Sequence, residues 1–523
     1  MAALKEFKPG FDYIAKTFAG LEEALLKELI ELGADDTKVI KRGVSFRGDD
    51  GVLFKANYLA RTALRVLKPI GVFEVNDAEQ LYEKVGKINW QSIFKLEQTF
   101  NVNAHVFNSE LDHSQFVALK SKDAIVDQFR ASTGKRPWVG KEDADIYIDV
   151  HLSGNVCTIS LDSSGESLHK RGYRIDADKA PINEVLAAGM VELTGWKGDK
   201  DLYDPMCGSA TIPIEAAMMA MSIPPGYYRK RFAFMNWEGF NEALWIKVKK
   251  EADEKIKELD CQIYASDRSR KAIDIAKRNL KNAGLHKDID LSVKYFDAIE
   301  PEIHEGILIF NPPYGNRLEE RNEIKNLYRG VGDVLKNNFS GFVAWLITAN
   351  LEAAKFIGLR PSARIELYNG PLESRLLKFD LYQGSKKNKY EKDHRKPDKE
   401  WKKDRKESDG KYDKRTKGKS FKRPEKENAR RDTGVKRAFK NPYKDDRELD
   451  WKKERVSRGS KFIKSDDDKS QKRSHKPDWK TDKDNRLKKR QSDTFKGPQL
   501  GKPDRTEYTG DGKKGSRKKR PRL

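Results

Sequence analysis

Apolar positions at two different spacings predict the elements of the first 160 residues. Leu21, Leu25, Leu29 and Leu32 recur at the spacing of one helical face, and Gly33 follows them as a natural helix end. In DIYIDVHL, residues 145–152, every second position is apolar, which predicts a strand with one buried face. Helical and alternating segments of this kind are typical of an α+β region rather than a wound parallel sheet.

Two further segments of this region carry start and stop signals. Residues 39–48 are expected to form a strand, a bend and a second strand. Residues 121–134 are expected to form a helix that Ser121 opens and Gly134 ends.

From residue 201 the pattern changes to strands that alternate with helices. Apolar runs such as ILIF and VAWLI have no polar face, as expected of parallel strands that are buried on both sides. The predicted strands end at residues 204, 267, 297, 310 and 348, and helices follow the first two. This order predicts a doubly wound, Rossmann-like α/β domain, in which ligands bind at the carboxyl ends of the strands.

From Gly384 onward the apolar pattern is lost and charge takes its place. Residues 384–523 hold 52 Lys and Arg against 26 Asp and Glu, whereas the first 383 residues carry a net charge of −3. A segment of this composition buries too little apolar surface to fold, so we expect a disordered basic tail. Isolated rings recur along it, among them Tyr390, Trp401, Tyr412, Phe421, Phe439, Tyr443, Trp451, Phe462, Trp479 and Phe495. Cations and stacking rings together predict a sequence-tolerant RNA tether, the alternative being a solubilising tail.

Composition excludes several classes of protein. Three cysteines cannot cross-link a secreted scaffold and lack zinc-ligand spacing, so we expect a reduced cytoplasmic chain without a metal. The first residues do not have the form of a signal peptide, and no apolar run is long enough to span a membrane. The high isoelectric point, near 9.5, favours a polyanionic partner such as a nucleic acid.

The loop after the first strand is a candidate ligand site. Small residues in Asp204-Pro-Met-Cys-Gly-Ser-Ala-Thr211 let a ligand approach the backbone, and the following helix presents free amide groups. The loop lacks the lysine of a P-loop and the glycine spacing of a dinucleotide fold, which argues against a nicotinamide dehydrogenase. Asp267 and Asp297, after the next two strands, are placed to accept from a ribose diol and from an adenine amino group. Each acid alone is more often a helix cap or a solvated turn, but in ordered combination with the first loop the two acids favour a ligand site.

The sharpest motif is Asn311-Pro312-Pro313-Tyr314 at the end of the fourth strand. Two prolines remove amide donors and leave carbonyl acceptors, and the asparagine side chain adds another acceptor. Acceptors that converge on an exocyclic amine would hold its nitrogen against an electrophile, and Tyr314 would stack on the flipped base. The motif therefore predicts amino-group alkylation in which placement and electrostatics supply the rate.

Over residues 5–383 the chain resembles the THUMP-domain RNA methyltransferases of the RlmL type, which make N2-methylguanosine in 23S rRNA. The segments that carry the resemblance are FAGLEEALLKEL, ANYLARTALRVL, SKDAIVDQFR, LDSSGESLHKRGYR, APINEVLAAGM, DPMCGSATIPIEAA and NPPYGNRL. The resemblance implies an N-terminal α+β region over 1–165 that includes an RNA-gripping THUMP domain at about 45–162. A methyltransferase domain would cover 166–383, before the tail at 384–523.

The resemblance also implies roles for particular residues. S-adenosylmethionine would be the cofactor, with its ribose at Asp267 and its adenine at Asp297. Its methionine part would contact five residues of the first loop: Asp204, Cys207, Gly208, Ser209 and Thr211. The tetrad Asn311 to Tyr314 would hold the target base.

The chain departs from the family pattern in three places. Ala210 stands where the family usually has glycine. Residues 218–259 lengthen the first crossover and include Trp237 and Trp245, which are either core residues or part of an RNA-facing surface. Some relatives continue into a second methyltransferase that makes 7-methylguanosine, whereas this chain continues into the basic tail, so we expect one activity.

Two basic motifs carry weaker expectations. The cations of HKRGYR, residues 169–174, are either phosphate ligands between the domains or surface charges. Trp138, after Lys135-Arg136-Pro137, has the same two interpretations.

The alternatives to 23S rRNA guanine-N2 methylation are the same chemistry on tRNA, N6-adenine methylation, or an RNA-binding ribosome-assembly factor in which catalysis is secondary. A THUMP-containing thiolation enzyme would need a pyrophosphatase loop that the sequence lacks.

Overall fold

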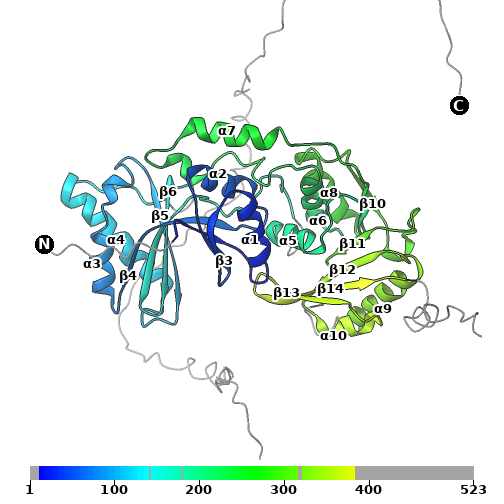
Figure 1. Ribbon diagram of the computed structural model, residues 1–523. Helices are drawn as coiled ribbons and strands as arrows, with labels where there is room; N and C mark the ends of the chain where they lie inside the picture. Colours follow the sequence, from blue (N-terminus) through cyan, green and yellow to red (C-terminus); the bar gives the residue numbers. More distant parts are fainter. Residues whose placement is uncertain (1–10, 141–142, 178–180, 316–320, 383–523) are drawn as a thin grey trace, which may run out of the picture. The chain divides into compact units, whose positions relative to one another are not determined.

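The computed structural model describes residues 11–140, 143–177, 181–315 and 321–382, which form two seven-stranded sheets with flanking helices (Figure 1). The tail from Gly384, together with its expected disorder, lies outside the described residues. None of the described helices is both long enough and apolar enough to cross a bilayer.

The N-terminal sheet is antiparallel apart from one parallel pair of strands. Its strands lie in the order β2-β3-β1-β4-β7-β6-β5, and only β5 and β6 run parallel. Their bounds are β1 Tyr13–Lys16, β2 Asp35–Ile40, β3 Gly43–Arg47, β4 Arg65–Glu74, β5 Phe100–Phe107, β6 Ile146–Ser153 and β7 Val156–Asp162. The helices are α1 Glu22–Glu31, α2 Asp50–Leu59, α3 Ala78–Gly86 and α4 Ser114–Thr133. The expectation of an α+β region is confirmed.

Most local predictions hold in this half, and one needs correction. The alternating residues of β6 are buried, and so are Leu21, Leu25 and Leu29 of the α1 segment. The helix predicted over 121–134 begins at Ser114 instead, where His113 accepts the N–H of Phe116. Ser121 is therefore no cap: it is buried within α4 and its hydroxyl donates to the carbonyl of Val117. A histidine cap was missed because the usual cap residues are Ser, Thr, Asp and Asn.

The second sheet is doubly wound and ends in an antiparallel hairpin. Its order is β10-β9-β8-β11-β12-β14-β13, with the first five strands parallel. The bounds are β8 Leu202–Asp204, β9 Ile263–Asp267, β10 Ile289–Val293, β11 Ile307–Phe310, β12 Val343–Thr348, β13 Ala363–Asn369 and β14 Leu372–Asp380. The helices are α5 Glu184–Thr194, α6 Thr211–Ala220, α7 Glu242–Asp253, α8 Arg270–Asn282, α9 Arg321–Asn337 and α10 Leu351–Ala354.

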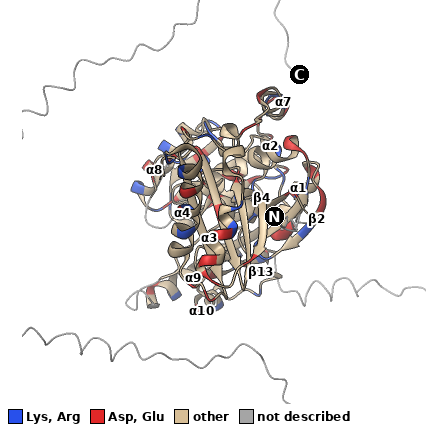
Figure 2. Ribbon diagram, turned by 90° about the vertical axis from the view of Figure 1, so that its left-hand side faces the viewer, with Lys and Arg blue, Asp and Glu red and all other residues tan. Residues whose placement is uncertain are grey.

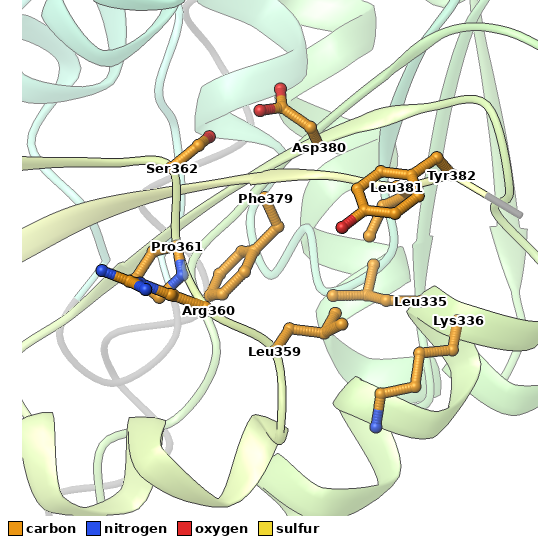
Figure 3. Close-up of a pocket in the computed structure, with 10 residues that line it drawn as sticks. All are labelled: Leu335, Lys336, Leu359, Arg360, Pro361, Ser362, Phe379, Asp380, Leu381 and Tyr382. Carbon is orange, nitrogen blue, oxygen red and sulfur yellow. The ribbon is translucent and has the colours of Figure 1, made fainter. Parts of the chain in front are cut away.

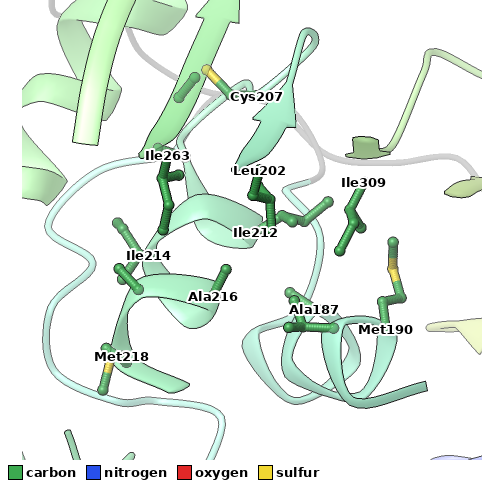
Figure 4. Close-up of a cluster of buried hydrophobic side chains, with 14 of the residues drawn as sticks. Ala187, Met190, Leu202, Cys207, Ile212, Ile214, Ala216, Met218, Ile263 and Ile309 are labelled. Carbon is green, nitrogen blue, oxygen red and sulfur yellow. The ribbon is translucent and has the colours of Figure 1, made fainter. Parts of the chain in front are cut away.

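The apolar sides of α5 and α6 fix the central strands of this sheet. Leu202, Ile263 and Ile309 lie in one buried cluster with residues of both helices (Figure 4). The loop between β8 and α6 is part of the same cluster, through the buried Cys207 and Ala210. The packing that holds the sheet together therefore also holds this loop.

The long first crossover packs against the N-terminal half. Trp245 of α7 is 8% exposed and meets Phe54 and Tyr58 of α2 edge-on, with ring centroids 6.0 and 5.4 Å apart. Trp237 is half-buried, and the Lys68 ammonium lies 5.8 Å from its centroid. Trp245 is thus a core residue and not part of an RNA-facing surface.

The arginines of the connector at residues 169–174 are turned inward, Arg171 buried and Arg174 half-buried, so the expectation that they hold phosphate is wrong. The Arg171 side chain is 1% exposed and pairs with Glu215 of α6, and Arg174 pairs with Glu184 at 2.7 Å. Burial, reinforced by Arg171 and Lys170, lowers the pKa of His169 to about 4, so this imidazole is neutral near pH 7. Among the cations of the connector only Lys170 is exposed, and Glu166 pairs with it.

Basic and acidic residues are interspersed on α3, α4 and α9 (Figure 2). This mixture agrees with the near-zero net charge of the first 383 residues.

Candidate functional site

The loops predicted to form a site lie together because of the strand order. β8 lies between β9 and β11, so the loops after these three parallel strands are neighbours at one edge of the sheet. The sheet reverses direction of winding between β8 and β11, and such switch points are where doubly wound sheets bind ligands.

Asp204 and Asp267 both accept backbone N–H groups of the first loop. One Asp267 oxygen accepts the N–H of Gly208 at 3.1 Å, and the other accepts the N–H of Ser269 at 2.8 Å. Asp204 is buried and accepts the N–H of Met206 at 3.2 Å. Burial raises the pKa of Asp204 well above its ordinary value, and the charge of Asp267 adds to the rise.

Gly208 and Ala210 give the loop its turn with left-handed backbone angles. Gly208 has φ +55°, and a β-carbon placed there would meet no atom within 4 Å, so the space above this residue is open. Ala210 has φ 64° and ψ 30° at the start of α6. The backbone therefore keeps a glycine-type conformation at the position where the family usually has glycine, at a cost to alanine of about 1–2 kcal/mol.

We expect Ala210→Gly to raise the free energy of unfolding by up to about 1 kcal/mol. Relief of the left-handed strain exceeds the loss of one buried methyl, which is worth about 0.8 kcal/mol. Denaturant unfolding measures the change. Ala216→Gly, an equally buried position inside α6, should lower stability by about 1–2 kcal/mol. If the two substitutions changed the free energy of unfolding equally, the backbone at Ala210 would not be strained.

Residues distant in sequence fix the first loop through hydrogen bonds. The side chain of Asn279 on α8 accepts the N–H groups of Ile175 and Asp176 and donates to the carbonyls of Asp176 and Ser209. Arg174 donates to the Thr211 hydroxyl at 2.9 Å. The connector and α8 therefore fix the loop on both sides of Ala210. Sequence reasoning missed Asn279, because nothing in the pattern of α8 separates it from a surface amide.

Asp297 lies farther from the end of its strand than predicted. β10 ends at Val293, and Asp297 lies four residues later on a short 3-10 helix, where it is exposed. It is thus not the last residue of its strand, although it follows the strand next to β9.

The tetrad Asn311–Tyr314 leaves the carboxyl end of β11 beside the first loop. Asn311 is half-buried, and its Oδ1 is fully buried without a hydrogen-bond partner among the described residues. Tyr314 is fixed by two asparagines: Asn350 donates to its carbonyl at 2.9 Å and Asn369 to its hydroxyl at 3.4 Å. Burial raises the pKa of Tyr314, so its phenol stays neutral.

A cavity of about 830 Å³ lies away from these loops (Figure 3). Phe379 and Asp380 line it and pair with the first residues of β12, at the opposite edge of the parallel strands. It contains no predicted site residue. The described residues also contain no group of three His, Cys, Asp or Glu that could hold a metal ion.

Three family models match the chain. The RlmL ferredoxin-like domain matches residues 12–67, the THUMP domain 75–162, and the RMKL-like methyltransferase domain 171–378.

Among curated proteins, the chain is 40% identical over 371 residues to "Putative RNA methyltransferase slr0064" of Synechocystis, covering 71% of this chain and 97% of the relative. Among solved structures, SMU.472 in complex with SAH is 30% identical, with a TM-score of 0.65, covering 72% of this chain and 99% of that one. A "predicted N6-adenine-specific DNA methylase" from Listeria monocytogenes is also 30% identical, with a TM-score of 0.63, covering 72% of this chain and 96% of that one.

Proposed function

Because the chain belongs to the RlmL type of THUMP-domain, S-adenosylmethionine-dependent RNA methyltransferases, we propose that it methylates the exocyclic N2 of a guanosine in 23S rRNA. The match to the RlmL ferredoxin-like domain supports this substrate over other RNAs. The coarser activity, methyl transfer to RNA, is that of the family.

The observation that carries the proposal is the orphan acceptor of Asn311. A buried oxygen without a hydrogen bond costs about 1–3 kcal/mol, and the chain recovers this when a donor arrives. The exocyclic amine of guanine is such a donor. The prolines that follow contribute carbonyls and no competing N–H groups.

The site accelerates the reaction by placing the amine. S-adenosylmethionine supplies an electrophilic methyl group. The amine lone pair would form the new N–C bond as the S–CH3 bond of the sulfonium breaks and S-adenosylhomocysteine leaves, and the nitrogen would then lose a proton to solvent. Asn311 draws the amine hydrogens away from the ring plane, which leaves the lone pair free to attack. The fixed Tyr314 offers a ring that stacks on the flipped base.

The first loop and the two later acids would hold the cofactor. We assign the methionine part to Asp204, Cys207, Gly208, Ser209 and Thr211, the ribose to Asp267 and the adenine to Asp297. The open space above Gly208 supports this placement. So does Asp267, whose carboxylate is fixed by two backbone N–H groups and keeps lone pairs for a diol.

We expect Asn279→Ala to weaken S-adenosylmethionine binding by about tenfold while RNA affinity stays within about twofold. Four hydrogen bonds are lost, of which the one to the Ser209 carbonyl is buried, and Ser209 is released from α8. Isothermal titration calorimetry with S-adenosylmethionine measures the first effect.

Asn282→Ala is the matched control. Asn282 lies one turn later on α8 and donates to the connector carbonyls of Gly172 and Tyr173, but not to the loop. Its loss should leave cofactor affinity unchanged. If both variants lowered the affinity for S-adenosylmethionine equally, Asn279 would act only through the connector.

The protein's division into residues 1–165, 166–383 and 384–523 and its cytoplasmic location are part of the proposal. The matched ranges support the first two boundaries. The three cysteines, all free, are consistent with a reducing compartment.

N6-adenine methylation is the second candidate, favoured by the name of the Listeria relative. Purified protein, labelled S-adenosylmethionine and large-subunit RNA from a strain lacking the gene separate the two. Label in N2-methylguanosine supports the proposal, and label in N6-methyladenosine replaces it. A parallel reaction with tRNA from the same strain tests the other substrate, and label in that reaction alone would identify tRNA as the substrate.

A further inference from the structure

Trp138 is exposed where the other described tryptophans are not. Its side chain is 76% exposed, whereas Trp237 is half-buried and the rest are 8% exposed or less: Trp90, Trp196, Trp245 and Trp345. An exposed indole keeps a large apolar surface in water, which is unfavourable unless something covers it.

The backbone around Trp138 is fixed rather than loose. Gly134 caps the end of α4, and four residues later the Trp138 carbonyl accepts the N–H of Phe100 at 3.0 Å. The N–H of Gly140 donates back to the Phe100 carbonyl at 3.0 Å, and Asn101 donates to the Gly140 carbonyl at 2.8 Å. Pro137 is buried. The segment is thus attached to the edge strand β5, so the indole is held on the surface at little further entropic cost.

Two exposed cations closely precede the indole in the sequence. Lys135 and Arg136 are exposed, and neither has an acidic partner among the described residues. Val139, 47% exposed, extends the apolar surface. A fixed ring beside two unpaired cations matches an unpaired base and its phosphates better than an apolar protein surface, because stacking and charge act together on a nucleic-acid strand.

The segment lies at the end of β5 that meets the catalytic half. Just before β5, Gln98 donates to the Asn236 carbonyl, and Asn236 donates to the Asp145 carbonyl. Residue 236 belongs to the crossover that follows α6. A strand of RNA on Trp138 is therefore held beside the crossover that joins α6 to β9.

We propose that Trp138, with Lys135 and Arg136, is a stacking platform for one unpaired base of the RNA substrate. This inference rests on the proposed function in taking RNA as the substrate, and adds a single-stranded contact separate from the Asn311 tetrad.

Fluorescence anisotropy with the full chain and a labelled single-stranded RNA of about 12 nucleotides tests it. Trp138→Ala should weaken binding about 5- to 100-fold without changing the dependence on salt, because stacking releases no counterions. Lys135→Gln with Arg136→Gln should instead make the slope of log affinity against log salt shallower by about 1.4. Trp138→Phe should retain most of the affinity.

Phe107→Ala is the matched control, since Phe107 is 50% exposed at the other end of β5 and has no neighbouring cation in sequence. If the Trp138→Ala variant bound the RNA as tightly as the Phe107→Ala variant, the stacking-platform proposal would be wrong. Binding does not depend on methyl transfer. If Trp138→Ala lost affinity but the intact protein methylated no RNA, the platform would stand and the proposed function would fail. If the intact protein methylated RNA but Trp138→Ala kept full affinity, the proposed function would stand and the platform would fail.

Discussion

Asn311→Ala should lower kcat for RNA methylation by about 10²–10³-fold or more, while S-adenosylmethionine affinity stays within about twofold. Removing one preorganised polar group that acts on the reacting centre typically costs this much. Asn311 belongs to the β11 end and is not among the residues assigned to the cofactor, so the two effects separate. Single-turnover kinetics with bound RNA measures the first, and calorimetry measures the second.

Asn338→Ala is the control for this prediction. Asn338 is a half-buried asparagine whose amide donates to the Ile299 carbonyl, two residues after Asp297 and away from the Asn311 tetrad in the sequence. The Asn338→Ala variant should have a slightly lower free energy of unfolding and an unchanged kcat for methylation. Methylation by Asn311→Ala at the rate of Asn338→Ala would remove the tetrad from the mechanism.

Deleting residues 384–523 should weaken RNA binding by about 10²-fold or more at about 0.1 M salt and flatten its salt dependence. The deletion removes 52 Lys and Arg against 26 Asp and Glu. For single-stranded RNA, each phosphate that the protein no longer neutralises makes the slope shallower by about 0.7. Cofactor affinity should not change, because every residue assigned to the cofactor lies before residue 300.

A second tail variant separates charge from stacking. Replacing the isolated aromatic residues of the tail by alanine keeps its charge, so affinity should fall while the salt slope remains. An unchanged slope after the full deletion would contradict the tether, and the tail would then serve only solubility.

The sequence predicts those parts of the site that follow from strand order. An apolar run that ends in Asp204, Asp267 or Asn311 places the residue at the carboxyl edge of a parallel sheet, and adjacency follows from the winding. The structure brings these residues together as predicted. Asp297 is displaced because β10 ends early, and the end of an exposed edge strand is poorly fixed by an apolar pattern.

Long-range contacts are what the sequence does not predict. The connector arginines are typical of a phosphate site, yet Arg171 pairs with Glu215 and donates to the carbonyl of Arg61, 110 residues earlier. A buried ion pair follows only from the packing of distant elements, not from its local sequence. Trp245 was ambiguous for the same reason, because its partners Phe54 and Tyr58 lie in another domain of the sequence.

Hydrogen bonds of Arg61 also join the N-terminal region to the methyltransferase domain. Arg61 donates to the carbonyls of Met218 and Ile223, and Glu28 accepts from the backbone of Arg61 and Thr62. These bonds join α1 of the N-terminal region to the end of α6. The helix α6, which follows the first loop, is thus attached to the N-terminal region that precedes the THUMP domain.

The most direct test of the proposed activity is mass spectrometry of nucleosides from large-subunit rRNA of a strain lacking this gene, beside its parent. We predict the loss of one N2-methylguanosine, restored by the intact gene and not by the Asn311→Ala variant. An unchanged level of N2-methylguanosine in this rRNA would contradict the proposal. This holds whether N6-methyladenosine or a tRNA nucleoside changed instead, or no nucleoside changed in any RNA.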